Sequence, residues 1–364
     1  MNWKIWAIFV AIIGVAVFVE IPCFKAHAGE IPSTSGYKVL PSIRHGNLTV
    51  FPVVAERSHD TRDFLTLDEG LRSGEVVVSE LGSVQPLIRR RPHYPMGERQ
   101  DGAEVNRLVL VNNAHRPLIL LAGEIVTGGK QDRVIGKDRL VPAESDPVDL
   151  SVFCVEPGRW VATSAQFGSM KSAMAQPKVR AQAMAPKNQE MVWSEVRKAQ
   201  AGMAESLSPP AAAEVRDTSS YARVMQNDEV REKVDSVAAP MEKEYRSLIQ
   251  QLRDRNAVGV VVAVNGRIIW SDVFASTELL QKYWPKLVRS YAAEAVIERA
   301  KSGDADLKSA QQFLDDIEGR HKTVESEPGL YRHTEIAGDG FEAFELTSLL
   351  PKKGFDLHVA KMSD

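Results

Sequence analysis

The sequence has 364 residues, with 45 lysines and arginines against 48 aspartates and glutamates and a formal net charge of -3. Charged residues make up 26% of the chain and hydrophobic residues 44%, which is the composition of an ordinary globular protein. These values exclude a disordered chain, a polytopic membrane protein and a basic nucleic-acid-binding protein. Two cysteines are too few for a disulfide framework.

The first 28 residues have the features of a secretory signal peptide. Lys4 provides a positive start, residues 5–19 form an unbroken apolar run, and Ala26-His27-Ala28 supplies small residues where a signal peptidase reads them. We therefore expect cleavage after this tripeptide and a periplasmic or secreted mature protein. The alternative is an uncleaved segment, in which residues 5–24 anchor the chain in the inner membrane. Apart from this segment, no contact with a membrane is expected.

Residues 29–165 are predicted to be rich in β-strands, because short runs of branched apolar residues alternate there with turn formers. The predicted strands cover residues 48–54, 75–81, 107–111, 118–122 and 150–155. A short helix is expected over 66–72, with Thr66 as its N-cap and Glu69 three residues later. Strands of this length and spacing favour an antiparallel sandwich or an open barrel.

Residues 166–256 are predicted to form a helical arm with connectors. A helix is expected over 189–204, and a second begins at Asp228, where apolar residues recur at helical spacing and Pro240 should kink or divide the helix. The stretches interpreted as breaks are 176–186 and 208–213. We expect the arm to pack on the sheets. A coiled coil that binds a protein partner is the alternative.

Residues 257–364 are predicted to complete the same globular unit. Asn265-Gly266 separates the apolar runs 258–264 and 267–274, which predicts a hairpin with a type I′ turn, since both central residues of that turn need positive φ. The further predicted elements are helices over 277–296 and 306–318 and strands over 341–346 and 355–360. The fold class is therefore α+β: a β-rich N-terminal sandwich or open barrel, a helical arm, and a C-terminal hairpin with helices.

An unusual polar segment follows the predicted strand 118–122. Its glycines and polar residues are Glu124, Gly128, Gly129, Lys130, Gln131 and Arg133. The paired glycines allow the backbone to turn with positive φ or to approach a ligand closely. Lys130 and Arg133 supply cationic donors and Gln131 an amide, and the Glu124 carboxylate completes a set that suits an anionic or carbohydrate-like ligand. The alternative is a hairpin turn with solvated charges. A phosphate loop is excluded, because Gly129 stands where that motif requires lysine.

A second polar segment extends from Cys154 to Trp160. Cys154 is interpreted as a small buried hydrophobic residue, and a thiolate nucleophile beside Arg159 is disfavoured because Glu156 would repel an oxyanion. Arg159 and Trp160 join the predicted ligand-binding residues. Glu156 and Glu124 are the predicted acid–base pair, in which the surroundings raise the pKa of one carboxyl group. The tryptophans whose apolar neighbours also fit a place in the core are Trp160, Trp270 and Trp284.

No metal and no cofactor are expected. The histidines form neither H-x-H nor H-E-x-x-H, so most are interpreted as isolated surface residues, and Cys154 has no C-x-x-C partner. The serine-hydrolase motif G-x-S-x-G is absent as well. The basic cluster Arg89-Arg90-Arg91 is interpreted as an exposed loop, and no nucleic-acid partner is expected, because the net charge is negative.

The two polar segments and the hairpin resemble the ARG and rhodanese-phosphatase-superfamily-associated protein domain, a bacterial domain family of unknown function. Residues 122–134, 152–160 and 258–274 carry the resemblance, which extends over most of the mature chain. The family is named for an association with ADP-ribosylglycohydrolases and rhodanese-like phosphatases, and association implies neither activity for this chain. The resemblance does imply that the two polar segments form one site. It also favours a nucleotide- or ADP-ribose-like ligand.

Two functions are therefore open at the level of sequence. In the first, an exported protein binds a polar or anionic small ligand at the Glu/Lys/Gln/Arg site, either as an enzyme or as a binding protein. In the second, a non-enzymatic envelope protein uses the same charges as a structural clasp between strands, and its helical arm binds a protein partner.

Overall fold

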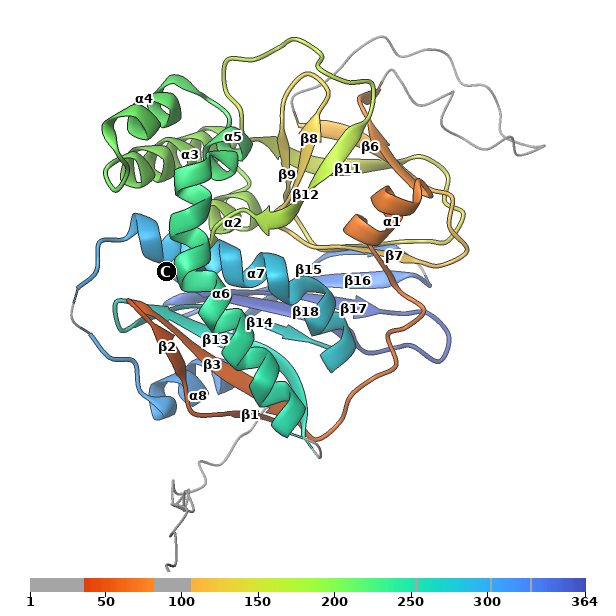
Figure 1. The fold of residues 1–364 in the computed structure, drawn as a ribbon. Coiled ribbons are helices and arrows are strands. Elements are labelled where there is room, and N and C mark those ends of the chain that lie inside the picture. Colours follow the sequence, from red (N-terminus) through yellow and green to blue (C-terminus); the bar gives the residue numbers. More distant parts are fainter. Residues whose placement is uncertain (1–35, 82–105, 253–254, 302, 328) are drawn as a thin grey trace, which may run out of the picture. The chain divides into compact units, whose positions relative to one another are not determined.

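The computed structural model describes residues 36–81, 106–252, 255–301, 303–327 and 329–364, all within the unit Ser33–Asp364 (Figure 1). The predicted signal segment and the basic cluster at residues 89–91 lie outside the described residues. Among the helices of the described ranges, none combines the length and the hydropathy needed to cross a lipid bilayer.

A nine-stranded antiparallel sheet combines the first described strands of the chain with the last ones. Its order is β1-β3-β13-β14-β18-β17-β16-β15, and β2 pairs with β3 beside this path. The strands are β1 (Tyr37–Val39), β2 (Ile43–His45), β3 (Leu48–Ala55), β13 (Asn256–Val264), β14 (Arg267–Phe274), β15 (Gly319–Glu327), β16 (Tyr331–Gly338), β17 (Phe341–Ser348) and β18 (Asp356–Ser363). β3 and β13 are apolar along almost their whole length, because both lie inside the sheet and are covered on both faces.

The predicted hairpin is confirmed as β13 and β14. Asn265 and Gly266 have φ angles of 53° and 76°, as a type I′ turn requires. The register then places Asp272 between Val260 of β13 and Ala360 of β18, in the interior of the sheet. A carboxylate is thereby buried among apolar strands and needs a charged partner.

The polar segments belong to a six-stranded sheet with the order β12-β8-β9-β11-β6-β5. Its strands are β5 (Val76–Ser79), β6 (Arg107–Asn112), β8 (Glu124–Gly128), β9 (Arg133–Ile135), β11 (Val148–Cys154) and β12 (Phe167–Met174). A three-stranded sheet contains β4 (Leu65–Thr66), β7 (Leu118–Leu120) and β10 (Arg139–Val141). β12 lies where the sequence predicts the start of the helical arm; its sequence FGSMKSAM has low β-propensity, and pairing with β8 overrides that preference.

Most of the predicted helices are confirmed. The helices are α1 (Leu67–Ser73), α2 (Pro177–Met184), α3 (Gln189–Ala204), α4 (Pro209–Asp217), α5 (Tyr221–Gln226), α6 (Asp228–Gln251), α7 (Thr277–Ile297) and α8 (Leu307–Asp315). Thr66 and Glu69 form the expected capping box of α1, and Pro240 lies inside an undivided α6. The interpretation of residues 176–186 and 208–213 as breaks was wrong. These stretches contain α2 and the start of α4, because proline in a first helical turn starts a helix instead of interrupting one.

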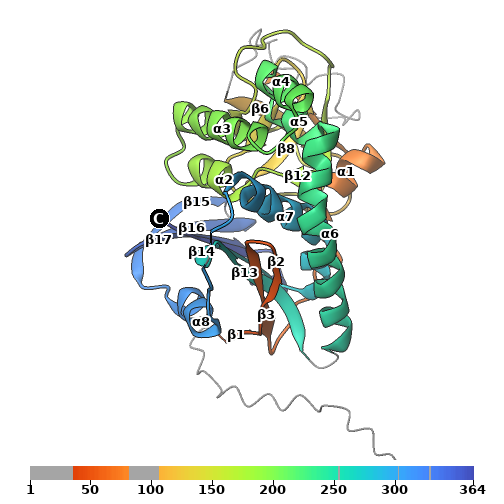
Figure 2. The same cartoon turned by 60° about the vertical axis from the view of Figure 1, so that its left-hand side comes forward.

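Helix α7 lies between the six-stranded sheet and the nine-stranded sheet, with α2 beside it (Figures 1 and 2). Buried side chains of both sheets and of α7 belong to one hydrophobic cluster, which includes Ile125, Val262 and Leu287. Polar side chains of α7 are therefore buried against strands that are far apart in the sequence. The α+β class predicted from the sequence is confirmed.

Candidate functional site

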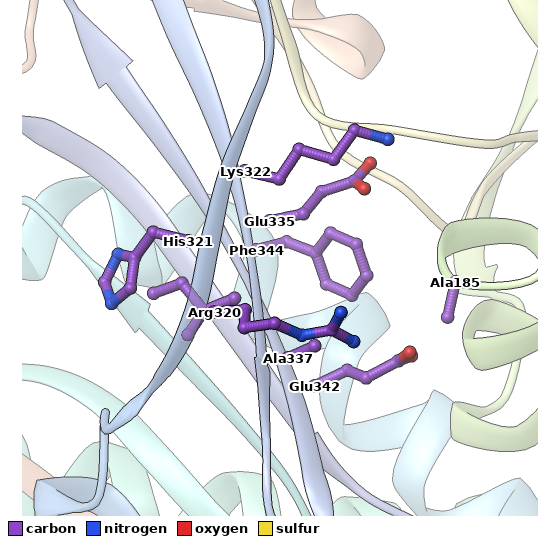
Figure 3. Close-up of a pocket in the computed structure, with 9 residues that line it drawn as sticks. Ala185, Arg320, His321, Lys322, Glu335, Ala337, Glu342 and Phe344 are labelled. Carbon is purple, nitrogen blue, oxygen red and sulfur yellow. The ribbon is translucent and has the colours of Figure 1, made fainter.

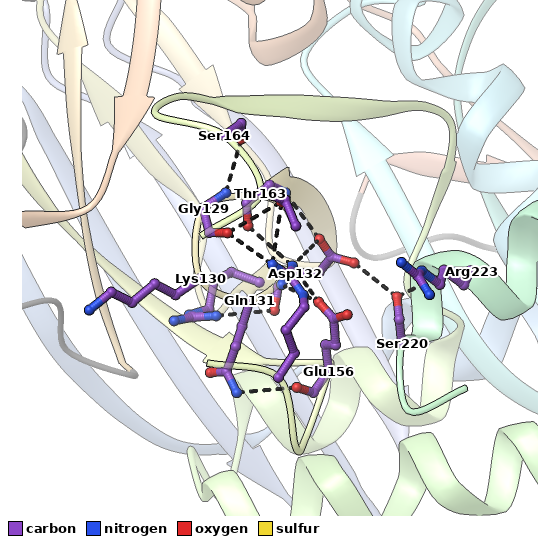
Figure 4. A network of polar contacts seen from close by, with 12 residues as sticks. Gly129, Lys130, Gln131, Asp132, Glu156, Thr163, Ser164, Ser220 and Arg223 are labelled. Carbon is purple, nitrogen blue, oxygen red and sulfur yellow. Dashed lines mark hydrogen bonds and ion pairs between the residues drawn. The ribbon is translucent and has the colours of Figure 1, made fainter. Parts of the chain in front are cut away.

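The turn between β8 and β9 brings the first polar segment against the rest of the six-stranded sheet. Gly128 and Gly129 both have positive φ, and a Cβ atom on Gly129 would lie 2.2 Å from Cζ of Phe167. In the turn, Gly129 N donates a hydrogen bond to Ser164 Oγ (3.1 Å) (Figure 4). Lys130 N donates one to Glu80 Oε1 (2.8 Å). Glycine is thus required here by both the backbone angle and the close packing.

Arg159 links the second polar segment to this turn. Its Nη2 donates to Glu156 Oε2 at 2.6 Å, and its Nη1 donates to the carbonyl oxygens of Gly129 and Val161, each at 2.9 Å. The hydrogen bond with Glu156 raises the pKa of Arg159. Only 18% of the Arg159 side chain is exposed, so most of its donors are used to hold the two segments together.

Asp132 completes the junction and is not among the site residues predicted from the sequence. Its Oδ1 accepts a hydrogen bond from Gly128 N (3.0 Å), and its Oδ2 accepts one from Ser220 Oγ at the N-terminus of α5 (2.9 Å). Its backbone N–H donates to Glu156 Oε2 (3.1 Å). Burial, followed by the nearby Glu156 carboxylate, raises the pKa of Asp132.

Trp160 lies at the exposed edge of this junction. The indole is 42% exposed, so the expectation that it belongs to the core is wrong, whereas Trp270 and Trp284 are buried as predicted. Lys130 Nζ lies 5.0 Å and Arg133 Cζ 6.0 Å from the centre of the Trp160 ring. These distances allow cation–π interactions with both cations. The Lys130 side chain extends away from Asp132 and Glu156 (Figure 4).

Gln131 and Arg133 of the same segment are buried. Gln131 Nε2 donates to the carbonyl oxygen of Glu156 (3.2 Å), while its Oε1 is buried and has no hydrogen-bond partner among the described residues. Burial lowers the pKa of Arg133, which is fully inaccessible. We call the residues Lys130, Gln131, Arg133, Glu156, Arg159 and Trp160 the Trp160 cluster. With the two turn glycines, it unites every predicted site residue except Glu124.

Glu124 contacts a different set of side chains at the other end of β8. Its Oε2 accepts a hydrogen bond from Leu121 N (2.8 Å), and its Oε1 pairs with Lys286 Nζ of α7 (2.5 Å). Lys286 also pairs with Asp68 of α1 (2.7 Å). Burial raises the pKa of Glu124; for Lys286, burial opposes the charge, but the two carboxylates raise its pKa. The contacts of Glu124 are thus those of a buried ion-pair network.

Cys154 is fully buried, as its interpretation as a small hydrophobic residue predicts. Its backbone N–H and C=O pair with the side-chain amide of Gln189 at 2.8 and 2.9 Å, and its Sγ accepts a hydrogen bond from Glu156 N (3.3 Å). Burial raises the pKa of the thiol, which opposes a thiolate nucleophile.

A second buried network, which was not predicted from the sequence, joins α2, β14 and β18. Arg180 forms two hydrogen bonds of 2.9 Å with Asp272, and His358 bridges Asp272 (3.0 Å) and Asp138 (2.5 Å). All four side chains are fully buried. Burial alone would favour the neutral imidazole, but Asp138 and Asp272 raise the pKa of His358 to about 9. The sequence feature that could have indicated this network is Asp272, a charged residue inside an apolar strand.

A cavity of about 330 Å³ lies on the face of β15, β16 and β17, next to Ala185 (Figure 3). Arg320, Lys322, Glu335 and Glu342 line it together with Phe344. Glu335 is paired with Lys187, and burial raises the pKa of Glu342. Within the described ranges, no group of three or more His, Cys, Asp or Glu side chains is placed to hold a metal ion.

The fold and these clusters describe an α+β protein in which a half-exposed tryptophan lies beside the turn between β8 and β9 of a six-stranded sheet. The chain belongs to the family of the ARG and Rhodanese-Phosphatase-superfamily-associated Protein domain, whose family model matches residues 36–361. The resemblance stated from the sequence is confirmed. The curated proteins and the solved structures compared with the chain gave no match.

Proposed function

We propose that this chain is an exported protein that binds a polar or anionic small ligand at the Trp160 cluster. One observation carries the proposal: an indole that is 42% exposed has Lys130 Nζ 5.0 Å from its ring centre. An exposed aromatic face beside a cation offers a stacking surface and an anion contact at the same place.

The neighbouring groups narrow the chemistry of the ligand. Gln131 Oε1 would accept a hydrogen bond from a hydroxyl or amide group, since this buried oxygen has no partner within the described ranges. The ligand would have a flat ring that stacks on Trp160, an anionic group that contacts Lys130 and a hydroxyl that donates a hydrogen bond to Gln131. A nucleotide- or ADP-ribose-like molecule has all three groups. Arg159 would position these groups through its internal hydrogen bonds.

Binding is tested by isothermal titration calorimetry, with ADP-ribose as the first probe and AMP and a hexose phosphate beside it. We expect Trp160→Ala and Lys130→Ala each to raise Kd about tenfold, since one stacking or cation contact contributes about 1–2 kcal/mol. Lys198→Ala is the matched control, because Lys198 is an exposed lysine on α3 that pairs with Glu195. Unchanged affinity in both cluster variants, or no binding of any probe, contradicts the proposal.

The second candidate is a structural clasp in a non-enzymatic envelope protein. The observation that favours it is the internal use of Arg159, whose guanidinium contacts Glu156 and the carbonyl oxygens of Gly128, Gly129 and Val161. In that case Arg159→Ala lowers the melting temperature, whereas Trp160→Ala changes neither stability nor ligand binding. A protein partner would then contact the helices between α3 and α6.

A further inference from the structure

A cavity of about 410 Å³ lies where α2, the end of α7 and the hairpin β13–β14 meet. Apolar side chains that include Ile269, Trp270 and Met362 line part of it. Charged side chains line the remainder: Lys178, Arg267, Glu294, Glu298 and Lys301. The cavity therefore combines an apolar wall with both signs of charge, which is the general character of a small-molecule site.

Glu294 places a buried carboxylate in the cavity wall. The side chain is 1% exposed, and its Oε2 accepts a hydrogen bond from Lys178 N in the first turn of α2 (3.2 Å). Its Oε1 lies 3.4 Å from Lys178 Nζ but has no hydrogen-bond partner in the part of the chain that the structure describes. Lys178 also pairs with Glu298. Glu294 Oε1 thus has an ion-pair partner but accepts no hydrogen bond.

Trp270 contributes a buried donor. The residue is 1% exposed, and Arg180 Cζ lies 4.4 Å from the centre of its ring. Its indole Nε1 is buried and has no hydrogen-bond partner among the described residues. Buried indole N–H groups usually have a partner. A donor without a hydrogen bond and a carboxylate oxygen held only by an ion pair at 3.4 Å, both in residues that line one cavity, therefore point to a ligand atom that serves both.

We propose that this cavity binds a small amphipathic carboxylate that carries a hydroxyl group. The hydroxyl accepts from Trp270 Nε1 and donates to Glu294 Oε1, because a hydroxyl can do both at once. The apolar body packs against Ile269 and Met362. The carboxylate binds Arg267, an exposed guanidinium at the cavity, which suits the planar geometry of a carboxylate. This site is independent of the Trp160 cluster.

The test uses 6-hydroxyhexanoate as the probe and the indole N–H signals of the ¹⁵N-labelled protein as the readout. We expect a saturable downfield shift of the Trp270 signal, since a new hydrogen bond forms at Nε1. Trp284 is the internal control, because its Nε1 is also buried without a partner within the described ranges, but it lies outside the cavity. Trp270→Phe and Trp284→Phe assign the two signals.

Calorimetry provides a measurement that does not depend on Trp270→Phe folding. We expect Arg267→Ala to weaken binding of the probe about tenfold. Arg299→Ala should bind like wild type, because Arg299 is exposed, pairs with Glu205 and does not line the cavity. Hexanoate, which lacks the hydroxyl, should bind at least about tenfold more weakly than the probe, since it forms neither of the two hydrogen bonds with Trp270 and Glu294.

Three results would overturn the proposal: a Trp270 signal that does not move, equal shifts of Trp270 and Trp284, or equal affinities of the two arginine variants. Trp160→Ala separates this proposal from the preceding one. This variant should show the same Trp270 shift and the same affinity for 6-hydroxyhexanoate as wild type, even where it weakens binding of ADP-ribose.

Discussion

Individual residues of the polar segments take their roles from partners that are distant in the chain. Glu124 lies in the same short motif as Lys130 and Gln131, yet its carboxylate pairs with Lys286 of α7, whereas Lys130 lies against the exposed ring of Trp160. Residue type and spacing alone present these side chains as one set. Burial gives them different roles. The Glu124 carboxylate is 2% exposed and requires a charged partner, whereas the accessible Lys130 does not.

Glu124→Gln is expected to destabilise the protein. The substitution leaves Lys286, which is 4% exposed, with Asp68 as its one remaining carboxylate in this network, and breaking one side of a buried ion pair costs about 2–4 kcal/mol. Urea unfolding measures this loss. Glu195→Gln is the control, because its partner Lys198 is largely exposed and the pair contributes less than about 1 kcal/mol. Wild-type stability of Glu124→Gln would instead support the acid–base role predicted from the sequence.

At the scale of elements, the turn between β8 and β9 shows how a short motif fixes a local geometry. Gly129 has a φ of 51° and packs against Phe167, while the flanking strands pair in register, Ile125 with Val134 and Val126 with Arg133. The turn therefore aligns the strands and also places Lys130 and Gln131 at the end of these two strands. A residue with a Cβ atom would disturb both.

Gly129→Ala should destabilise the protein more than Gly46→Ala. Both glycines have positive φ, so both substitutions carry a similar backbone cost of about 1 kcal/mol. Only at position 129 does the new Cβ meet neighbours, with Phe167 at 2.2 Å and Glu80 at 2.8 Å, whereas nothing lies within 4 Å at position 46. Overpacking adds about 1–3 kcal/mol. Equal melting temperatures of the two variants would show that the turn relaxes without cost.

At the scale of the whole described unit, buried charges connect elements that hydrophobic packing brings together. Arg180 of α2, Asp272 of β14 and His358 of β18 are joined by hydrogen bonds. A Cβ atom on Gly123 would lie 2.5 Å from Cγ of Arg180. The glycine before Glu124 thus leaves room for an arginine from another element. Removing one member of the network would leave a buried charge without its partner, which is strongly destabilising.

The His358 network predicts a loss of stability at alkaline pH. The folded-state pKa of about 9 lies above the unfolded value of about 6.5, so the contribution of His358 is fully present below pH 6.5 and is lost as the pH rises through 9. The shift corresponds to about 3 kcal/mol. NMR of the imidazole ring should show it protonated at pH 7.5. A ring that titrates near pH 6.5 would contradict the prediction.

Lys361 has the opposite effect on how the free energy of unfolding depends on pH. Burial lowers its pKa to about 8, below the unfolded value of about 10.4, so its charged form costs stability at low pH and this cost disappears as the pH rises. The pH dependence of unfolding should therefore be compared between wild type and Lys361→Met. The variant is expected to show the steeper fall in free energy of unfolding between pH 7 and 10.

The sequence by itself determined those features whose causes lie within a few residues. Asn265-Gly266 forms the type I′ turn, and Thr66 and Glu69 form the capping box, because the groups that satisfy each other are neighbours in the chain. The family was also recognisable from contiguous motifs. Tertiary structure decided the insertion of β3 beside β13, the pairing of Glu124 with Lys286, and the exposure of Trp160. These depend on strand register and helix docking between distant segments, and local periodicity does not specify the partner of a buried charge.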